Sequence, residues 1–113
     1  MDTEELAHRQ YLLGLLNRRI ARNMERLDEG FAKATGRPGL LTLLCACGRE
    51  DCQQPLLTIS SGDYDHARWS PHRFIIAPGH TTDIDEVVRV GDGFAIVEIK
   101  PQYREKEPVT SEG

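Results

Sequence analysis

The chain has 113 residues, of which 39% are hydrophobic and 28% charged, so it is long enough for one domain and short for two. Acidic residues outnumber basic ones by 18 to 14, so the formal net charge is −4. This charge excludes the class of nucleic-acid-binding proteins whose whole surface is basic. No apolar run approaches the ~20 residues of a membrane-spanning helix, and the acidic start of the chain is unlike a signal peptide. We therefore expect a cytoplasmic domain with no membrane partner.

Residues 1–30 predict a long amphipathic helix. The segment contains no proline, and its apolar residues recur at the intervals that line one helical face. These positions are Leu6, Leu13, Leu16, Ile20, Met24 and Leu27. Gly30 is the predicted stop, and residues 31–39 are the predicted linker. A helix of this length packs along the chain's own sheet, breaks near Gly14, or offers a surface to a protein partner or a second copy of the chain.

Residues 40–101 predict a small α+β body. Short apolar runs bounded by turn residues indicate strands at 40–44, 56–59, 73–77, 87–90 and 94–99. Ser60, three residues before Asp63, resembles a capping box that opens a short helix ending near Trp69. The predicted fold class is thus α+β: a long N-terminal helix, then a small, mostly antiparallel sheet of about five short strands with one short helix. Residues 102–113 are predicted to be a charged flexible tail.

The last two predicted strands form a hairpin. Asp92 and Gly93 lie between two alternating apolar runs, which is the usual signal of a tight turn. We expect Phe94 and Ile96, together with Val88 and Val90, to form one apolar face of this hairpin.

The three cysteines of the chain, Cys45, Cys47 and Cys52, fall within eight residues. An odd number of thiols in a cytoplasmic protein argues against a disulfide framework. Cys45 and Cys47 project to the same side of a strand end, and Gly48 permits the tight turn that brings Cys52 back. Three cysteines and one histidine form a standard closed site for structural zinc. The cluster therefore predicts a Zn(2+) site, and the alternative is three free thiols that pack as small hydrophobic side chains.

The fourth zinc ligand is expected to be one of the four histidines. His8 lies in the long helix, and His66 lies on the polar side of the short helix. His80 follows Pro78-Gly79 in a predicted turn, where a side chain can be aimed without disturbing a strand. His80 is the first candidate and His72 the second, and the residue pattern leaves both open.

The segment 43–100 resembles a family of small uncharacterised bacterial proteins. The resemblance is carried by a Cys-x-Cys-x4-Cys cluster, a tyrosine in the short helix, a Pro-x-Arg-Phe strand ending in Pro-Gly-His, and a valine-rich hairpin. In this chain these are Cys45, Cys47 and Cys52; Tyr64; Pro71, Arg73 and Phe74; Pro78, Gly79 and His80; and Val87, Val88 and Val97. The resemblance implies that His80 is the fourth ligand and that a helix precedes the body. It implies no activity.

Three kinds of function are compatible with these features. The first is a non-enzymatic, zinc-stabilised regulatory or protein-interaction module whose helix serves as the partner or dimer surface. The second is a nucleic-acid-binding regulator that uses a basic ridge of the helix made of Arg18, Arg19, Arg22 and Arg26. The third is a thiol redox sensor or a small hydrolase. Four protein ligands would leave zinc no position for a substrate water, and no catalytic motif is present in the sequence, so no catalytic residues are predicted.

Overall fold

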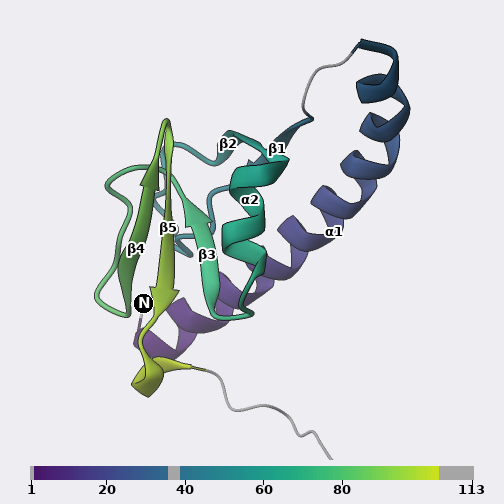
Figure 1. Ribbon diagram of the computed structural model, residues 1–113. Coiled ribbons are helices and arrows are strands. Elements are labelled where there is room, and N and C mark those ends of the chain that lie inside the picture. The colour runs from purple at the N-terminus through teal and green to yellow at the C-terminus, as the bar shows by residue number, and fades with distance from the viewer. Residues whose placement is uncertain (1, 36–38, 105–113) are drawn as a thin grey trace, which may run out of the picture.

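The computed structural model describes the backbone of residues 2–35 and 39–104, and the side chains of all of these except residues 25–35. Helix α1 (Thr3–Thr35) lies along one side of a body built from helix α2 (Ser61–Arg68) and the strands (Figure 1). The described part of the chain has five strands, all paired antiparallel. The predicted α+β fold is therefore confirmed. Within these same residues, no helix is both long and apolar enough to cross a bilayer.

The five strands form two sheets, where one was predicted. The first sheet has two strands and the second has three in the order β3-β5-β4; the strands are β1 (Leu40–Leu44), β2 (Leu56–Ser60), β3 (Arg73–Ile76), β4 (Asp85–Gly91) and β5 (Phe94–Ile99). The sheets adjoin just after β1, where the amide of Ala46 donates to the carbonyl of Ile75 at 2.8 Å. The chain then turns at Gly48, which has a φ of 80°, and this turn keeps β1 from pairing further with β3.

Helix α1 ends at Thr35, so the predicted helix end at Gly30 is wrong. The predicted linker over 31–39 is wrong for residues 31–35, which are helical. A single glycine inside a helix costs only about 1 kcal/mol relative to alanine. The five residues after Gly30 include no proline, and the stronger breakers Gly36 and Pro38 come later in the sequence. The helix also continues through Gly14.

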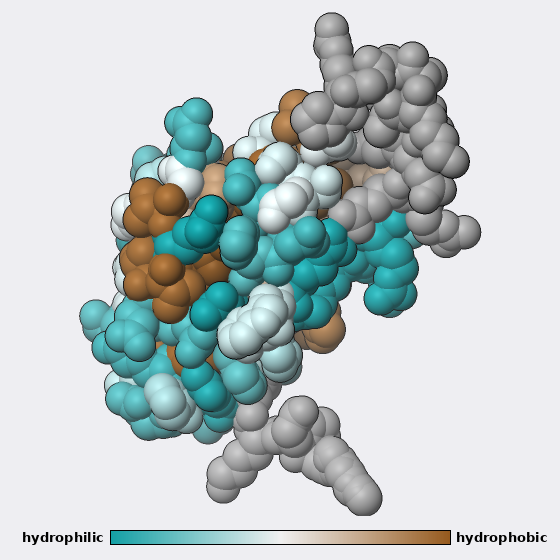
Figure 2. Space-filling view, in the orientation of Figure 1, coloured by the Kyte–Doolittle hydropathy of each residue, from teal (hydrophilic) through white to brown (hydrophobic). Residues whose placement is uncertain are grey.

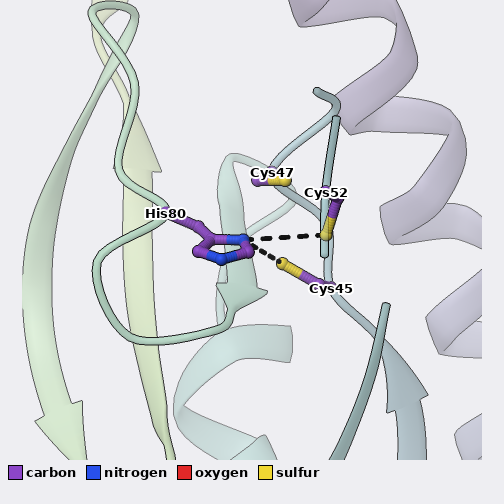
Figure 3. A group of neighbouring side chains, drawn as sticks. All are labelled: Cys45, Cys47, Cys52 and His80. Atoms are coloured by element: carbon purple, nitrogen blue, oxygen red, sulfur yellow. Dashed lines mark hydrogen bonds between the residues drawn. The ribbon is translucent and has the colours of Figure 1, made fainter. Parts of the chain in front are cut away.

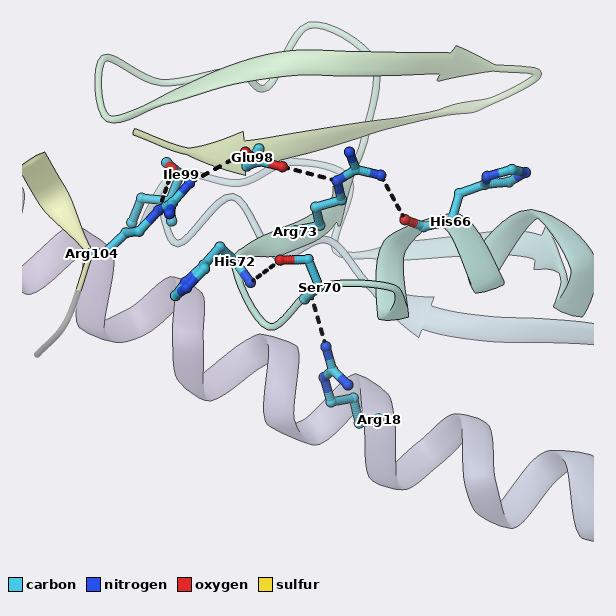
Figure 4. Close-up of polar contacts among 8 residues, drawn as sticks. All are labelled: Arg18, His66, Ser70, His72, Arg73, Glu98, Ile99 and Arg104. Atoms are coloured by element: carbon cyan, nitrogen blue, oxygen red, sulfur yellow. Dashed lines mark hydrogen bonds and ion pairs between the residues drawn. The ribbon is translucent and has the colours of Figure 1, made fainter. Parts of the chain in front are cut away.

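The start of the predicted flexible tail is ordered, so the prediction is wrong for residues 102–104. Residues Pro101–Tyr103 form a short 3-10 helix, η1, and Arg104 closes it against strand β5. The Arg104 guanidinium donates to the Glu98 carboxylate at 3.3 Å and to the Ile99 carbonyl at 3.1 Å (Figure 4). A proline at the start of η1 and an ion pair at its end order this segment. The remainder of the predicted tail, 105–113, lies outside the described residues.

The buried face of α1 is rotated away from the predicted leucine stripe. Small and polar side chains at its centre are at most 2% exposed: Ala7, Gln10, Asn17 and Ala21. The residues of the predicted stripe that pack at its borders are half-buried: Leu6, Leu13, Ile20 and Met24. Leu16 is 46% exposed, so its place in the buried face was predicted wrongly, and the side chain of Leu27 lies outside the described residues. Small residues occupy the centre of this face because the helix packs closely on the body. A Cβ added at Gly14 would lie 2.8 Å from the Phe74 ring.

Two buried polar side chains attach α1 to the body. Asn17 donates to the Leu44 carbonyl and accepts from the Leu44 amide, both at 2.8 Å, so it takes the place of a neighbouring strand at the free edge of β1. Gln10 donates to the buried carboxylate of Asp85 at 2.7 Å, and the amide of Thr82 donates to the same carboxylate at 3.0 Å. Burial raises the pKa of Asp85, and these hydrogen bonds partly offset the rise.

The predicted hairpin is present, but its apolar face is smaller than expected. Gly93 turns the chain between β4 and β5 with a φ of 84°, and Phe94 and Ile96 are buried. Val88 and Val90 are 42% and 73% exposed, so their predicted burial with Phe94 and Ile96 is wrong. They lie on β4, an outer strand whose alternation is broken by a register shift. Figure 2 shows apolar surface over this hairpin.

Candidate metal centre

The four predicted ligand residues come from two loops that meet beside α1 (Figure 3). Cys45 directly follows β1, Cys47 lies at the turn after it, and Cys52 lies in the segment leading to β2. His80 lies in the loop between β3 and β4 and points toward the three sulfur atoms. Residues as far apart as 45 and 80 in the sequence thus converge on one point.

The distances within this group match a tetrahedral metal site. The Nδ1 atom of His80 lies 3.4 Å from the Cys45 sulfur and 3.6 Å from the Cys52 sulfur, and the four potential ligand atoms all lie within 4.8 Å of one another. A tetrahedral ion with metal–sulfur bonds of about 2.3 Å and a metal–nitrogen bond of about 2.05 Å would place nitrogen and sulfur about 3.6 Å apart. The four residues can therefore hold one metal ion with little movement.

Backbone geometry aims the ligands. The positive φ of Gly48 turns the chain between Cys47 and Cys52, and the Arg9 side chain donates to the Gly48 carbonyl at 2.7 Å, which holds this turn against α1. A Cβ at Gly48 would lie 3.0 Å from the Leu6 carbonyl oxygen, so the turn packs directly on the helix. On the other side of the site, Gly79 has a φ of 82° and begins the turn that presents the histidine.

The thiols of Cys45 and Cys47 differ in acidity because they interact with each other. The interaction of their side chains raises the pKa of Cys45 and lowers the pKa of Cys47, since a proton on the Cys45 sulfur stabilises a thiolate on Cys47. Burial raises the pKa of both thiols, and the Ala77 amide, which donates to the Cys45 sulfur at 3.1 Å, partly offsets this for Cys45. Coordination of both sulfur atoms by one ion requires both thiols to lose their protons.

The other histidines lie elsewhere. Nδ1 of His72, the second candidate, is 2.8 Å from the hydroxyl of Tyr11, which places its ring against α1. His8 and His66 are exposed on the two helices. Among the residues that the structure describes, the only group of three or more histidine, cysteine or acidic side chains close enough to share an ion is the one that contains His80.

Charged neighbours of the cluster are paired with each other. Arg49 donates to Asp51 at 3.0 Å, and this guanidinium lowers the pKa of the Asp51 carboxyl. Both side chains are largely exposed. The ion pair with Asp51 weakens the effect of the Arg49 charge on the pKa of the neighbouring thiols.

The basic ridge predicted on α1 is divided by the fold. Arg18 is half-buried and donates to the Ser70 carbonyl at 3.0 Å, so it serves the packing of α1 on the loop after α2 (Figure 4). Arg19 and Arg22 are exposed, and the side chain of Arg26 lies outside the described residues.

The two buried polar residues that attach α1 to the body were not predicted from the sequence. Gln10 and Asn17 resemble ordinary polar helix residues, and only the positions of Asp85 and Leu44 explain their burial. No local signal in the sequence identifies such long-range partners.

No protein-family model, no curated protein and no solved structure matches the chain. The family resemblance inferred from the cysteine cluster and the Pro-Gly-His motif stays a prediction.

Proposed function

We propose that the protein is a non-enzymatic interaction module whose body is stabilised by one zinc ion. The observation that carries the proposal is the convergence of Cys45, Cys47, Cys52 and His80 within 4.8 Å. Three thiolates and one imidazole nitrogen form a soft donor set that favours zinc over magnesium or calcium. No carboxylate belongs to the group, which further disfavours the harder ions.

A structural role for the ion follows from the number of ligands. Four protein donors complete a tetrahedral shell, whereas catalytic zinc keeps one position for water or substrate. The ion would join the end of β1, the segment that leads to β2 and the loop after β3, and so would hold the two sheets together. Zinc binding would thereby contribute directly to the free energy of folding.

The proposed interaction role rests on the face of α1 that does not pack on the body. Helix α1 uses one face to pack on β1 and β3 and leaves three leucines on the opposite face, Leu12, Leu15 and Leu16. A helix longer than the body requires, with apolar residues on its free face, is typical of a surface for another protein chain.

The zinc content of the purified protein tests the proposal. We expect about one zinc per chain. The Cys47→Ser variant is expected to lose stoichiometric zinc, and His80→Ala to bind it at least tenfold more weakly. His66→Ala is the matched control, because this histidine is exposed and outside the cluster. A wild-type protein without zinc, whose melting temperature does not respond to added zinc or to a chelator, would contradict the proposal.

A further inference from the structure

The outward face of α1 carries an apolar centre between two charged ends. Leu12, Leu15 and Leu16 are 48%, 65% and 46% exposed. Together with neighbouring arginines they line a shallow groove of about 480 Å³. The spacing of three and four residues places the leucines on one side of the helix, opposite the side that packs on the body.

The charges on this outward face are segregated along the helix. Glu4 and Glu5 lie toward the N-terminus of α1, and Arg19 and Arg22 lie on the other side of the leucines, all four exposed. The acidic pair lies about ten residues before the centre of the apolar patch and the basic pair about six residues after it. The face is therefore acidic at one end, apolar in the middle and basic at the other.

We propose that this face binds the same face of a second copy of the chain, with the two α1 helices antiparallel. A two-fold axis through the leucine patch brings the patch of one copy onto that of the other. The same rotation places Glu4 and Glu5 of each copy near Arg22 of its partner, offset by about 3 Å along the helix axis, with Arg19 further inward, at both ends of the interface. A parallel arrangement would instead place acidic ends together and basic ends together.

The arrangement predicts a weak, reversible dimer. The stretch from Glu4 to Arg22 is about 27 Å long at 1.5 Å per residue, and one helix pair of this length is at the small end of specific interfaces. Its charged ends are exposed, so the association is expected to weaken with added salt. The proposal rests on the interaction role proposed above and is independent of the metal.

Sedimentation velocity measurements at low salt, from about 10 to 500 µM chain, test the dimer. This range covers dissociation constants of tens to hundreds of micromolar, which are those expected of a weak dimer. The wild type is expected to shift from monomer to dimer across the range. Leu15→Glu is expected to remain monomeric, because it places a charge in the apolar centre. Leu56→Glu is the matched control: Leu56 is 57% exposed on β2, and its change should leave the dimer intact.

Charge reversal tests the antiparallel orientation. A chain with Glu4→Arg and Glu5→Arg has two basic ends, and one with Arg19→Glu and Arg22→Glu has two acidic ends. Each alone is expected to dimerise at least fivefold more weakly than the wild type, and an equimolar mixture is expected to recover association. A chain with all four changes should again form a homodimer, because its ends are exchanged but remain complementary.

Zinc content and circular dichroism of each variant separate this proposal from the previous one. A folded, zinc-loaded wild type that remains monomeric at 500 µM would overturn the dimer and leave the metal proposal intact. A dimer that Leu15→Glu leaves unchanged would overturn the assigned surface. The protein could instead stay monomeric and bind single-stranded nucleic acid. If the Arg19→Glu and Arg22→Glu changes then abolish this binding, the face is assigned to nucleic acid as its partner.

Discussion

Replacing Asn17 with alanine is expected to destabilise the protein more than any surface change on α1. The substitution removes two hydrogen bonds of 2.8 Å and leaves the amide and the carbonyl of Leu44 without their partner at the edge of β1. A buried backbone group without a partner costs about 1–3 kcal/mol, and the half-burial of Leu44 favours the lower part of this range. Two such groups, less about 0.5 kcal/mol for the better helix propensity of alanine, give a loss of about 2–3 kcal/mol.

Urea unfolding followed by circular dichroism, with zinc in excess, measures this loss. Asn23→Ala is the matched control, since Asn23 is an exposed asparagine of the same helix and its replacement should be neutral or slightly stabilising. Amide hydrogen exchange gives a local readout, because the Leu44 amide should lose protection in the Asn17 variant. A loss below about 1 kcal/mol, with the Leu44 amide still protected, would refute the view that Asn17 substitutes for a strand.

Three further predictions concern backbone space, turn geometry and pH. Gly14→Ala, which stabilises most helices, is expected to lower the unfolding midpoint here because its Cβ would lie 2.8 Å from the Phe74 ring; recovery on combining it with Phe74→Leu would identify the clash as the cause. Gly93→Val is expected to cost at least about 1 kcal/mol in urea unfolding, since a β-branched residue resists a φ of 84°, and an unchanged midpoint would contradict the turn assignment. Zinc is expected to be released as the pH falls, because protons compete for the thiolates. A colorimetric chelator titrated with acid measures the release.

The ligand cluster was predictable because its signal is local and chemical. Three cysteines within eight residues and a glycine between them imply a shared centre whatever the rest of the fold does. His80 was the first candidate from its place in a turn, and the structure places its Nδ1 atom beside the sulfurs. The uneven acidity of Cys45 and Cys47 was not predictable, because it depends on the contact between the two side chains and on the Ala77 amide.

The buried face of α1 was only partly predictable, because periodicity counts apolar residues and not their partners. Leu13 and Ile20 do pack against the core, but at its border. The centre of the contact is made by residues whose burial depends on distant groups: Gly14 on the Phe74 ring, and Asn17 on a free strand edge. The division of five strands into two sheets was likewise invisible, because it depends on where the cysteine turn stops the pairing.

The position of the candidate metal site between the two sheets has a consequence for the lifetime of the protein. An ion that joined Cys52 to His80 would tie together segments 28 residues apart in the sequence. Because such an ion binds the folded chain and not the unfolded one, it would stabilise the fold by about 2.7 kcal/mol at a free concentration one hundred times its dissociation constant. A small domain has a total stability of only about 5–15 kcal/mol, so loss of the ion raises the unfolded fraction by orders of magnitude. Unfolded chains are the substrates of cellular proteases. We therefore expect the turnover of the protein, and with it the cellular amount, to follow the supply of zinc.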